Sequence, residues 1–546
     1  MRKWAPIAIL AAAQFVMVLD TTVMNVAISN VVADLDTTVS QVQLAITLYT
    51  LVMAALMLTG GKLGDIFGRR RAFAIGLVIY GSGSLTTALS PSIGVLLFGW
   101  SGLEGIGAAL VIPAIASLTA GNYEGRDRAV AYGVIGAMAA VGVAAGPLIG
   151  GFVTEAASWR WVFAGEVVVI IGILLTVRRV RDVARPDHIP KLDLAGVVLS
   201  AAGMALIVLG VLRAPEWGLL APKGALTIAG TEITPFGLSA VPFIISAGVV
   251  LLAVFVRWTR RREDLGRDTL LRTDLFGVAQ LRAGLAMLSA QQLILNGIFF
   301  VLPLYLQVVL GKNALQTGVQ ILPISVAMLI SVAVAQRLGT RLSPRTIVRI
   351  GLFAMLGAAI TLMSSIDYEL NGVVFSIGLA LFGVGVGMLA SQLGNVIMSS
   401  VGSERASEAG GLQGTAQNIG ASLGTALIGA VLLAGLAASA QKAINEDPQI
   451  APEVKQQVTR AAQTGVEFVP ASSVEQAATE AGVPPAQASA IAAHYADSQL
   501  LALKEALAAA GIFVLVGFWF AGRLPTEPLG RREEQGNPTA RAPAPA

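Results

Sequence analysis

Fourteen long apolar stretches fill most of this chain of 546 residues. Each could cross a bilayer, because a hydrocarbon core about 30 Å thick requires roughly 20 apolar helical residues. A transmembrane barrel would instead show alternating segments of about 10 residues. The chain is therefore predicted to be an all-α integral membrane protein. We place its spans at residues 7–31, 43–61, 72–90, 93–119, 130–152, 161–177, 194–212, 237–256, 284–309, 315–335, 346–364, 372–398, 408–435 and 503–522.

The distribution of basic residues predicts how the chain is oriented. If the N-terminus is cytoplasmic, the segments on that side of the membrane carry 29 of the 37 Lys and Arg residues. This asymmetry is the one that separates cytoplasmic from outer loops in membrane proteins. We therefore expect both termini in the cytoplasm and no nucleic-acid partner, despite the net charge of +4. The abundance of Arg and Ala is typical of a GC-rich bacterial genome, which predicts the bacterial inner (cytoplasmic) membrane.

The breaks between spans divide the chain into six helices, then two, then six. Residues 61–76 align without gaps on residues 336–351, and both lie between the second and third helices of a six-helix set, which indicates two similar halves. A polar outside loop, residues 436–502, is expected to contain short helices and offers a surface for a partner outside the membrane. The predicted domains are 1–180 (first six-helix bundle), 181–258 (linker and two inserted helices with an outside hairpin around Ala229-Gly230), 259–283 (basic linker), 284–524 (second six-helix bundle) and 525–546 (cytoplasmic tail).

Three carboxylates, Asp20, Glu104 and Glu166, lie near the middle of their predicted spans and therefore at a similar depth. Acids inside a membrane are energetically costly and indicate a functional site. No Lys or Arg lies near the middle of any predicted span, and a buried carboxylate without a cation favours its protonated form. Such acids could exchange protons against a positively charged compound. The alternatives are a protonated Glu104 that bonds between helices and a Glu166 that reaches the outer surface.

Neutral polar side chains near the middle of other spans are candidates for lining a cavity. Because no fixed cation accompanies them, an anionic substrate is disfavoured, and lipophilic cations or neutral amphiphiles fit better. The candidates are Asn25, Gln291, Gln292, Asn296, Gln392, Asn395, Gln413, Gln417 and Asn418.

Two glycine-containing segments carry more specific patterns. Residues 60–71 form a Gly-rich turn with one acid and several bases, and its candidate functional residues are Gly61, Asp65, Gly68, Arg69 and Arg70. In the fifth span, glycines recur every four residues, which leaves one helix face flat for close packing, and a proline removes a backbone hydrogen bond and bends the helix. The residues of this second pattern are Gly133, Gly142, Gly146, Pro147, Gly150 and Gly151.

These two patterns, together with residues 19–30 (LDTTVMNVAISN), resemble the signature motifs of the major facilitator superfamily, and in particular of its 14-helix drug:proton antiporters of the EmrB/QacA type. The resemblance implies two six-helix bundles plus two additional transmembrane helices that open alternately to each side. It also implies that Asp65 belongs to a cytoplasmic latch and that the Gly/Pro helix is the antiporter motif.

The chain departs from the family pattern at the polar positions inside the membrane. Ser101 stands where the family usually has Arg, and Glu104 stands where it has Gln. Glu166 replaces a typical Asn, and Gln417 occupies a position where Arg is common. A proton path that depends on those arginines therefore cannot be transferred to this chain.

We predict a proton-coupled secondary transporter that exports lipophilic, cationic or neutral amphiphilic compounds, as in multidrug efflux. The proton gradient supplies the energy, and no cofactor is expected because no Walker-type sequence occurs. The absence of a nucleophile–base or metal-ligand pattern argues against an enzyme and against a metal site. Two alternatives stay open: an exporter of a lipid or secreted metabolite without strict proton coupling, and a sensor or assembly subunit that does not transport.

Overall fold

The computed structural model describes residues 2–182, 191–222, 226–228, 231–401, 406–463 and 466–527, and the statements below concern these ranges. Thirteen helices in them are long and apolar enough to cross a membrane. A further helix, α4 (Arg69–Ala88), lies between the second and third of these and contains more Gly, Ser and Thr. It packs against α6 and α8, which accounts for a fourteenth span and agrees with the predicted number.

The first helical set begins with α1, whose apolar run the sequence predicted as one span over 7–31. The structure breaks it at Ala27, so that α1 is followed by a short separate helix, α2. A second irregularity is the π-helical segment η2, which interrupts the fourth span immediately before α6. The elements are η1 (Arg2–Trp4), α1 (Ala5–Val26), α2 (Ile28–Asp34), α3 (Val39–Phe67), α4, α5 (Ile93–Leu96), η2 (Leu97–Glu104), α6 (Gly105–Asn122), α7 (Gly125–Ala156), α8 (Arg160–Thr176) and η3 (Val177–Arg179).

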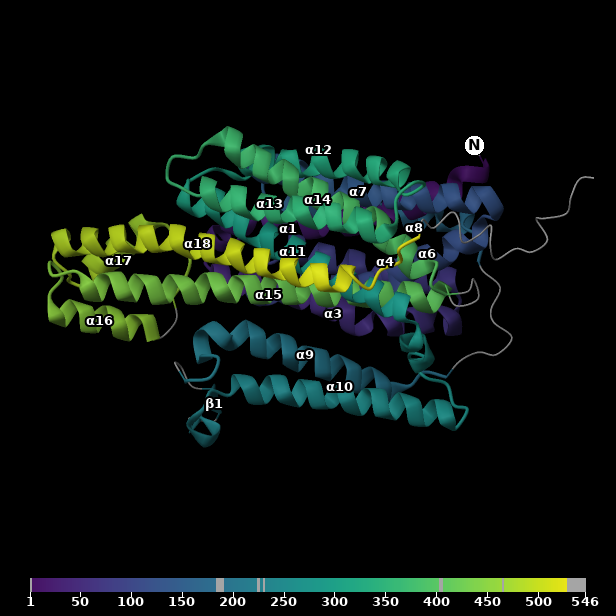
Figure 1. Cartoon of the computed structure of the whole chain (residues 1–546), viewed down its shortest axis with the longest axis horizontal. Coiled ribbons are helices and arrows are strands. Elements are labelled where there is room, and N and C mark those ends of the chain that lie inside the picture. The colour runs from purple at the N-terminus through teal and green to yellow at the C-terminus, as the bar shows by residue number, and fades with distance from the viewer. Residues whose placement is uncertain are drawn as a thin grey trace, which may run out of the picture.

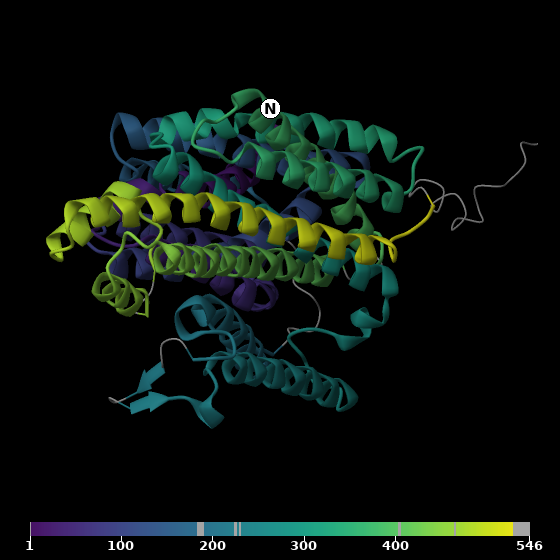
Figure 2. The same cartoon turned by 60° about the vertical axis from the view of Figure 1, so that its left-hand side comes forward.

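Two further long helices, α9 (Leu194–Trp217) and α10 (Val241–Asp264), pack against each other and lie beside the main bundle, where α9 contacts α3 and α15 (Figures 1 and 2). Between them, β1 (Leu226–Ile228) pairs antiparallel with β2 (Thr231–Ile233), with Leu226 opposite Ile233. The strands expected on either side of Ala229-Gly230 are therefore present, while these two residues lie outside the described ranges. A short helical turn, η4 (Pro235–Gly237), leads into α10.

The second set of helices shows how local sequence sets helix ends. Asn313 and Gln316 form a capping box at the start of α12, and the Asn371 side chain accepts two backbone N–H bonds at the start of α14. The elements are η5 (Thr273–Gly277), α11 (Ala279–Leu304), the π-helical η6 (Tyr305–Val309), α12 (Ala314–Leu338), α13 (Pro344–Ser365), α14 (Gly372–Met398), α15 (Ala406–Glu446), α16 (Pro452–Gln463), α17 (Ala471–Glu480) and α18 (Pro485–Ala521).

Residues 436–502 are largely helical. With 41 residues, α15 is about 60 Å long, twice the thickness of a hydrocarbon core. Together with α18 it projects beyond the other helices, and α16 and α17 lie at this projecting end (Figure 1). A small apolar cluster that includes Ile444, Val454 and Ile491 packs α15, α16 and α18 together. The idea that this projection binds a partner stays a prediction.

The two helical sets contact each other along two helix pairs, α3 with α15 and α7 with α12. We call the face of the bundle where α1 begins and α3 ends the basic face. Toward the opposite face, Gln307 donates a hydrogen bond to the Val26 carbonyl at 2.6 Å, and Gln43 donates to the Thr425 carbonyl at 2.9 Å. The sets are therefore joined by hydrogen bonds on the side away from the basic face.

Close packing of α7 on α12 depends on glycine. A Cβ atom placed on Gly318 of α12 would collide with the backbone carbonyl of Pro147, and one on Gly151 of α7 would lie 2.5 Å from the Ala314 oxygen. Nearer the basic face, Gly133 and Gly136 of α7 have open space where a Cβ would be. The two helices therefore touch at the end away from the basic face, where there is no room for a side chain at Gly318 or at Gly151.

We expect Gly318→Ala to push α12 away from α7 and to destabilise the fold by about 1–3 kcal/mol, the usual range for overpacking. Thermal unfolding of the purified protein in detergent measures this loss. Gly136→Ala, on the open part of α7, is the matched control and should leave the midpoint unchanged. Equal midpoints for the two variants would contradict the close contact.

The projecting end of α15 is joined to α18 by a hydrogen bond, in which His494 Nε2 lies 2.7 Å from Asp447 Oδ2. The hydrogen bond with His494 lowers the pKa of Asp447, because it favours the ionised carboxylate. The stabilisation of the projection by this hydrogen bond is present above the ordinary pKa of an aspartate and is lost as the pH falls through the lowered pKa of Asp447.

Asp447→Asn should therefore speed hydrogen exchange in α16 at neutral pH, while Asp497→Asn, on the same projection, should not. Identical exchange rates in all three proteins would contradict this role.

Candidate functional site

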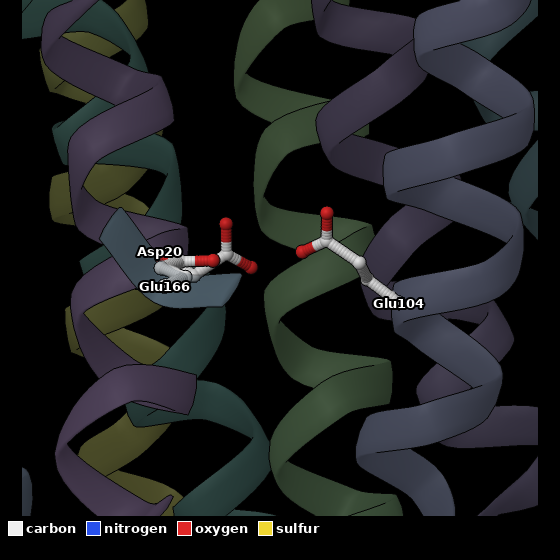
Figure 3. Close-up of side chains that lie close together, drawn as sticks. All are labelled: Asp20, Glu104 and Glu166. Carbon is white, nitrogen blue, oxygen red and sulfur yellow. The ribbon is translucent and has the colours of Figure 1, made fainter. Parts of the chain in front are cut away.

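The three buried acids come from three different helical segments and meet at one point. Asp20 lies on α1, Glu104 ends η2 and Glu166 lies on α8. One carboxylate oxygen from each can be chosen so that all three lie within 4.8 Å of one another. Figure 3 shows their side chains directed toward a common centre. Asp20 and Glu104 are fully buried and Glu166 is 2% exposed, so none of them reaches the outer surface.

Asp20 is held by one neighbouring side chain in particular. The indole N–H of Trp100 donates to both of its oxygens, at 2.8 Å and 3.0 Å. Trp100 in turn stacks on Tyr49 of α3, with ring centroids 4.8 Å apart and planes 4° from parallel. Sequence reasoning missed Trp100, because a tryptophan in an apolar span looks like ordinary packing. Its position four residues before Glu104 was the signal that both face the same side.

Glu104 and Glu166 receive their hydrogen bonds from α4. The Thr87 hydroxyl donates to Glu104 at 3.1 Å, and the Ser84 hydroxyl donates to Glu166 at 3.2 Å. The second oxygen of each glutamate is buried and has no hydrogen-bond partner among the described residues. Gly83 makes this approach possible, because a Cβ there would lie 2.5 Å from the Glu104 side chain. These α4 residues were also missed, since serine and threonine are common in membrane helices.

The acids lack a positively charged partner. Within the described ranges, no Lys, Arg or His forms an ion pair with Asp20, Glu104 or Glu166. Three ionised carboxylates so close together in an apolar medium would repel one another strongly. The cluster must therefore be neutralised by a small cation, and the proton is the smallest. Chemically, the site can take up, share and release protons.

The Gly-rich turn forms an ion-paired corner on the basic face. Asp65 at the end of α3 bonds to Arg69 at 2.6 Å, and Arg69 also contacts Ser117 of α6. Gly68 separates α3 from α4 with φ +97°, a conformation that favours glycine. The Arg70 backbone N–H donates to Asp182 at 3.0 Å. The turn thus connects α3, α4, α6 and the segment after α8.

The glycines at 60 and 61 differ in their surroundings. A Cβ on Gly61 would be 3.9 Å from Pro113, which is ordinary contact, whereas one on Gly60 would collide with the Ala109 carbonyl. The close approach of α3 to α6 therefore depends on Gly60, which the sequence motif does not single out. The sequence alone could not show which of the adjacent glycines, Gly60 or Gly61, lies at the close contact.

The four-residue repeat on α7 faces α1. Gly142 packs against Val18, Gly146 against Thr22 and Gly150 against Val23. Pro147 and Gly151 lie on the side that contacts α12, whereas Gly133 faces open space and has no neighbouring atom within 4 Å of the position that a Cβ would take. The residues of this sequence pattern thus lie on two faces of α7, one toward α1 and one toward α12, and Gly133 lies on neither.

The neutral polar candidates are spread over α1, α11, α14 and α15, and none of them is hydrogen-bonded to the three acids within the described ranges. Six of the nine donate to backbone carbonyls: Asn25 to Thr21, Gln291 to Val386, Asn296 to Gln292, Gln392 to Ala335, Asn395 to Ser391 and Asn418 to Gly414. The partly or fully exposed candidates are Gln292, Asn296, Asn395, Gln413, Gln417 and Asn418. The last three lie on α15, the helix that packs against α3 of the first set, and they remain the candidates for contact with a substrate.

Comparison with known proteins agrees with this architecture. The family model of the Major Facilitator Superfamily matches residues 10–425. The chain belongs to this superfamily. It is 30% identical to the puromycin resistance protein of Streptomyces alboniger over 443 residues, which cover 80% of this chain and 83% of that protein. It is 33% identical to the cephamycin export protein of Amycolatopsis lactamdurans over 421 residues, covering 75% and 80%.

The fold is also similar to a solved superfamily structure. A bacterial homologue of the human lysosomal transporter Spinster, in an inward-facing and unoccupied conformation, superposes with a TM-score of 0.56 at 15% identity, covering 95% of this chain and 96% of that one. The predicted fold class and the resemblance drawn from the sequence motifs are thus confirmed. The protein is a multi-pass membrane transporter of this superfamily, not an enzyme.

Neutralising one member of the acidic cluster should stabilise the protein when the others are ionised. We expect Glu166→Gln to raise the unfolding midpoint at alkaline pH by the equivalent of about 1 kcal/mol, a few degrees at most. The difference should shrink as the pH falls, because protonation neutralises the native carboxylate as well. The exposed Glu155→Gln is the control. An unchanged or lower midpoint for Glu166→Gln at alkaline pH would show that the three acids do not repel one another.

Proposed function

We propose that the protein exports lipophilic, cationic or neutral amphiphilic compounds in exchange for protons, by alternating access of a substrate path between its two helical sets. The observation that carries this proposal is the meeting of Asp20, Glu104 and Glu166 within 4.8 Å, with no ion pair to a basic residue among the described ranges. The negative charge of these buried carboxylates can be neutralised by protons in one conformational state of the transporter and by a nearby cationic substrate in the other. The proton gradient then supplies the energy, and no cofactor is required.

The residues have separate proposed roles. Asp20 and Glu104 are the proton-titrating pair, and Glu166 is the third acid that shares their charge. Asp65 and Arg69 form a latch between α3 and α4 on the basic face. Pro147 and Gly151 of α7 supply the contact with α12 along which one helical set moves against the other, while Gly142, Gly146 and Gly150 hold α7 on α1 of its own set.

We further propose that the basic face lies in the cytoplasm, with both termini on that side and the projection of α15 and α18 outside a bacterial inner membrane. The distribution of Lys and Arg supports this orientation. The two bacterial relatives described above carry names of drug resistance and export, which supports outward transport of small molecules.

A second candidate is the export of a secreted metabolite without strict proton coupling. One relative is named a cephamycin export protein, which favours transport of a product made by the cell itself. Efflux of such a metabolite should then proceed at the same rate with and without an imposed pH gradient, whereas exchange requires the gradient.

The test uses the full-length protein in proteoliposomes with an imposed pH gradient, and compares a cationic dye with a neutral lipid. Asp20→Asn and Glu104→Gln should each reduce gradient-driven dye transport at least tenfold and remove its dependence on pH, because each deletes an exchangeable proton. The exposed Glu369→Gln is the control. Unchanged pH dependence in both variants would refute proton exchange at this site and leave the fold as it is.

A further inference from the structure

We infer that Trp100 is the positioning residue of the proton site: its indole N–H orients Asp20, opposes the protonation that burial favours, and so sets the pH at which this acid exchanges its proton. The inference deepens the proposed function and rests on it. None of the relatives' names and no motif described above assigns a role to this tryptophan.

The contact itself is specific. The indole nitrogen is a donor only, and here it donates to both oxygens of one carboxylate, at 2.8 Å and 3.0 Å. Both side chains are almost completely buried, with Trp100 1% and Asp20 0% exposed. A hydrogen bond from a neutral donor to a buried carboxylate favours the charged form of that carboxylate. Trp100 therefore opposes the protonation that burial promotes.

The donor is fixed in place before the acid titrates. The Trp100 ring stacks on Tyr49, and the hydroxyl of the next residue, Ser101, donates to the Ala45 carbonyl of α3 at 2.8 Å. Both contacts attach η2 to α3, and the π-helical winding of η2 is a feature often found at functional sites. The indole thus does not depend on Asp20 for its orientation.

The other titratable groups around Asp20 act less directly than Trp100. Glu104 on η2 and Glu166 on α8 are acids, which disfavour a second negative charge nearby when they are ionised. The hydroxyls of Tyr49 on α3 and Tyr80 on α4 lie close enough to Asp20 to favour its charged form as well, but neither has a partner in hydrogen-bond geometry among the described residues. Trp100, which donates to both oxygens of Asp20, is therefore the principal donor to the charged form.

A neutral donor suits an exchangeable proton better than a base would. An arginine at the adjacent position 101, where this chain has Ser, would add a fixed positive charge and hold Asp20 as a permanent ion pair. The indole adds no charge, so the carboxylate is favoured but can still accept a proton. The arrangement keeps Asp20 titratable although it is fully buried.

Trp100→Phe tests the inference, because phenylalanine keeps an aromatic ring against Tyr49 and removes the N–H. We expect the internal pH for half-maximal dye export from proteoliposomes to rise by about 1–2 units, the equivalent of one hydrogen bond to a charged group. The matched control is Trp159→Phe, which removes a buried indole that donates to Asp34 at 3.0 Å, away from the three acids. This control should keep the wild-type pH profile.

Two further arms separate the possible failures. In an Asp20→Asn background, which has lost the pH dependence, Trp100→Phe should cause no further loss of dye transport, because the acid that it positions is gone. If the wild-type protein shows gradient-driven export and Trp100→Phe leaves the pH profile in place, this inference is overturned and the proposed function stands. If the wild type shows no gradient-driven export, the proposed function fails first.

A measurement on the native side chain covers the case in which Trp100→Phe does not fold. In protein labelled with 15N-indole tryptophan, the Trp100 N–H resonance should shift with pH, and this titration should be absent in Asp20→Asn. A Trp100 resonance that does not respond to pH in the folded wild-type protein would overturn the inference.

Discussion

The free energy required to bury a carboxylate in an apolar interior is the constraint on which the rest of this structure depends. Three such groups share one point in the first helical set, and no base among the described residues offsets them. Hydrogen bonds from Trp100, Ser84 and Thr87 compensate only part of the lost hydration. In the proposed function bound protons supply the remainder, which would couple the protonation state of the three acids to the stability of the fold around them.

Most of the fold could be predicted from the sequence, because span length and charge distribution are direct consequences of bilayer thickness and of membrane electrostatics. The break at Ala27 and the π-helical segments could not, since each depends on tertiary contacts rather than on hydropathy. The extent of α15 was also missed. Beyond the predicted span that ends at residue 435, its sequence becomes more polar but stays Ala-rich and has no helix-breaking residue. The helix therefore continues where the hydropathy falls.

The candidate site could be predicted in part, for a similar reason. Position along a span gives depth, and Asp20, Glu104 and Glu166 were expected at a common depth. Their direction around each helix axis could not be derived, because these helices are apolar on all sides and show no amphipathic face. For the same reason Gly60, which lets α3 approach α6, gave no signal of its own, and the one sequence clue to Trp100, which bonds to Asp20, was its spacing of four residues from Glu104. Contacts between helices decide such roles.

Helix α1 connects the three acids to the interface between the two helical sets, because it carries Asp20 and also packs on α7. Asp20 faces the cluster from α1, while Val18, Thr22 and Val23 of the same helix pack on the glycines of α7. The opposite side of α7 packs on α12 without room for an added methyl group. Because packed helices of this kind adopt discrete arrangements rather than deforming continuously, a displacement of α1 on protonation of Asp20 would have to be accommodated at the α7–α12 contact. In the proposed mechanism, a proton bound inside one set would thereby bias the position of the other.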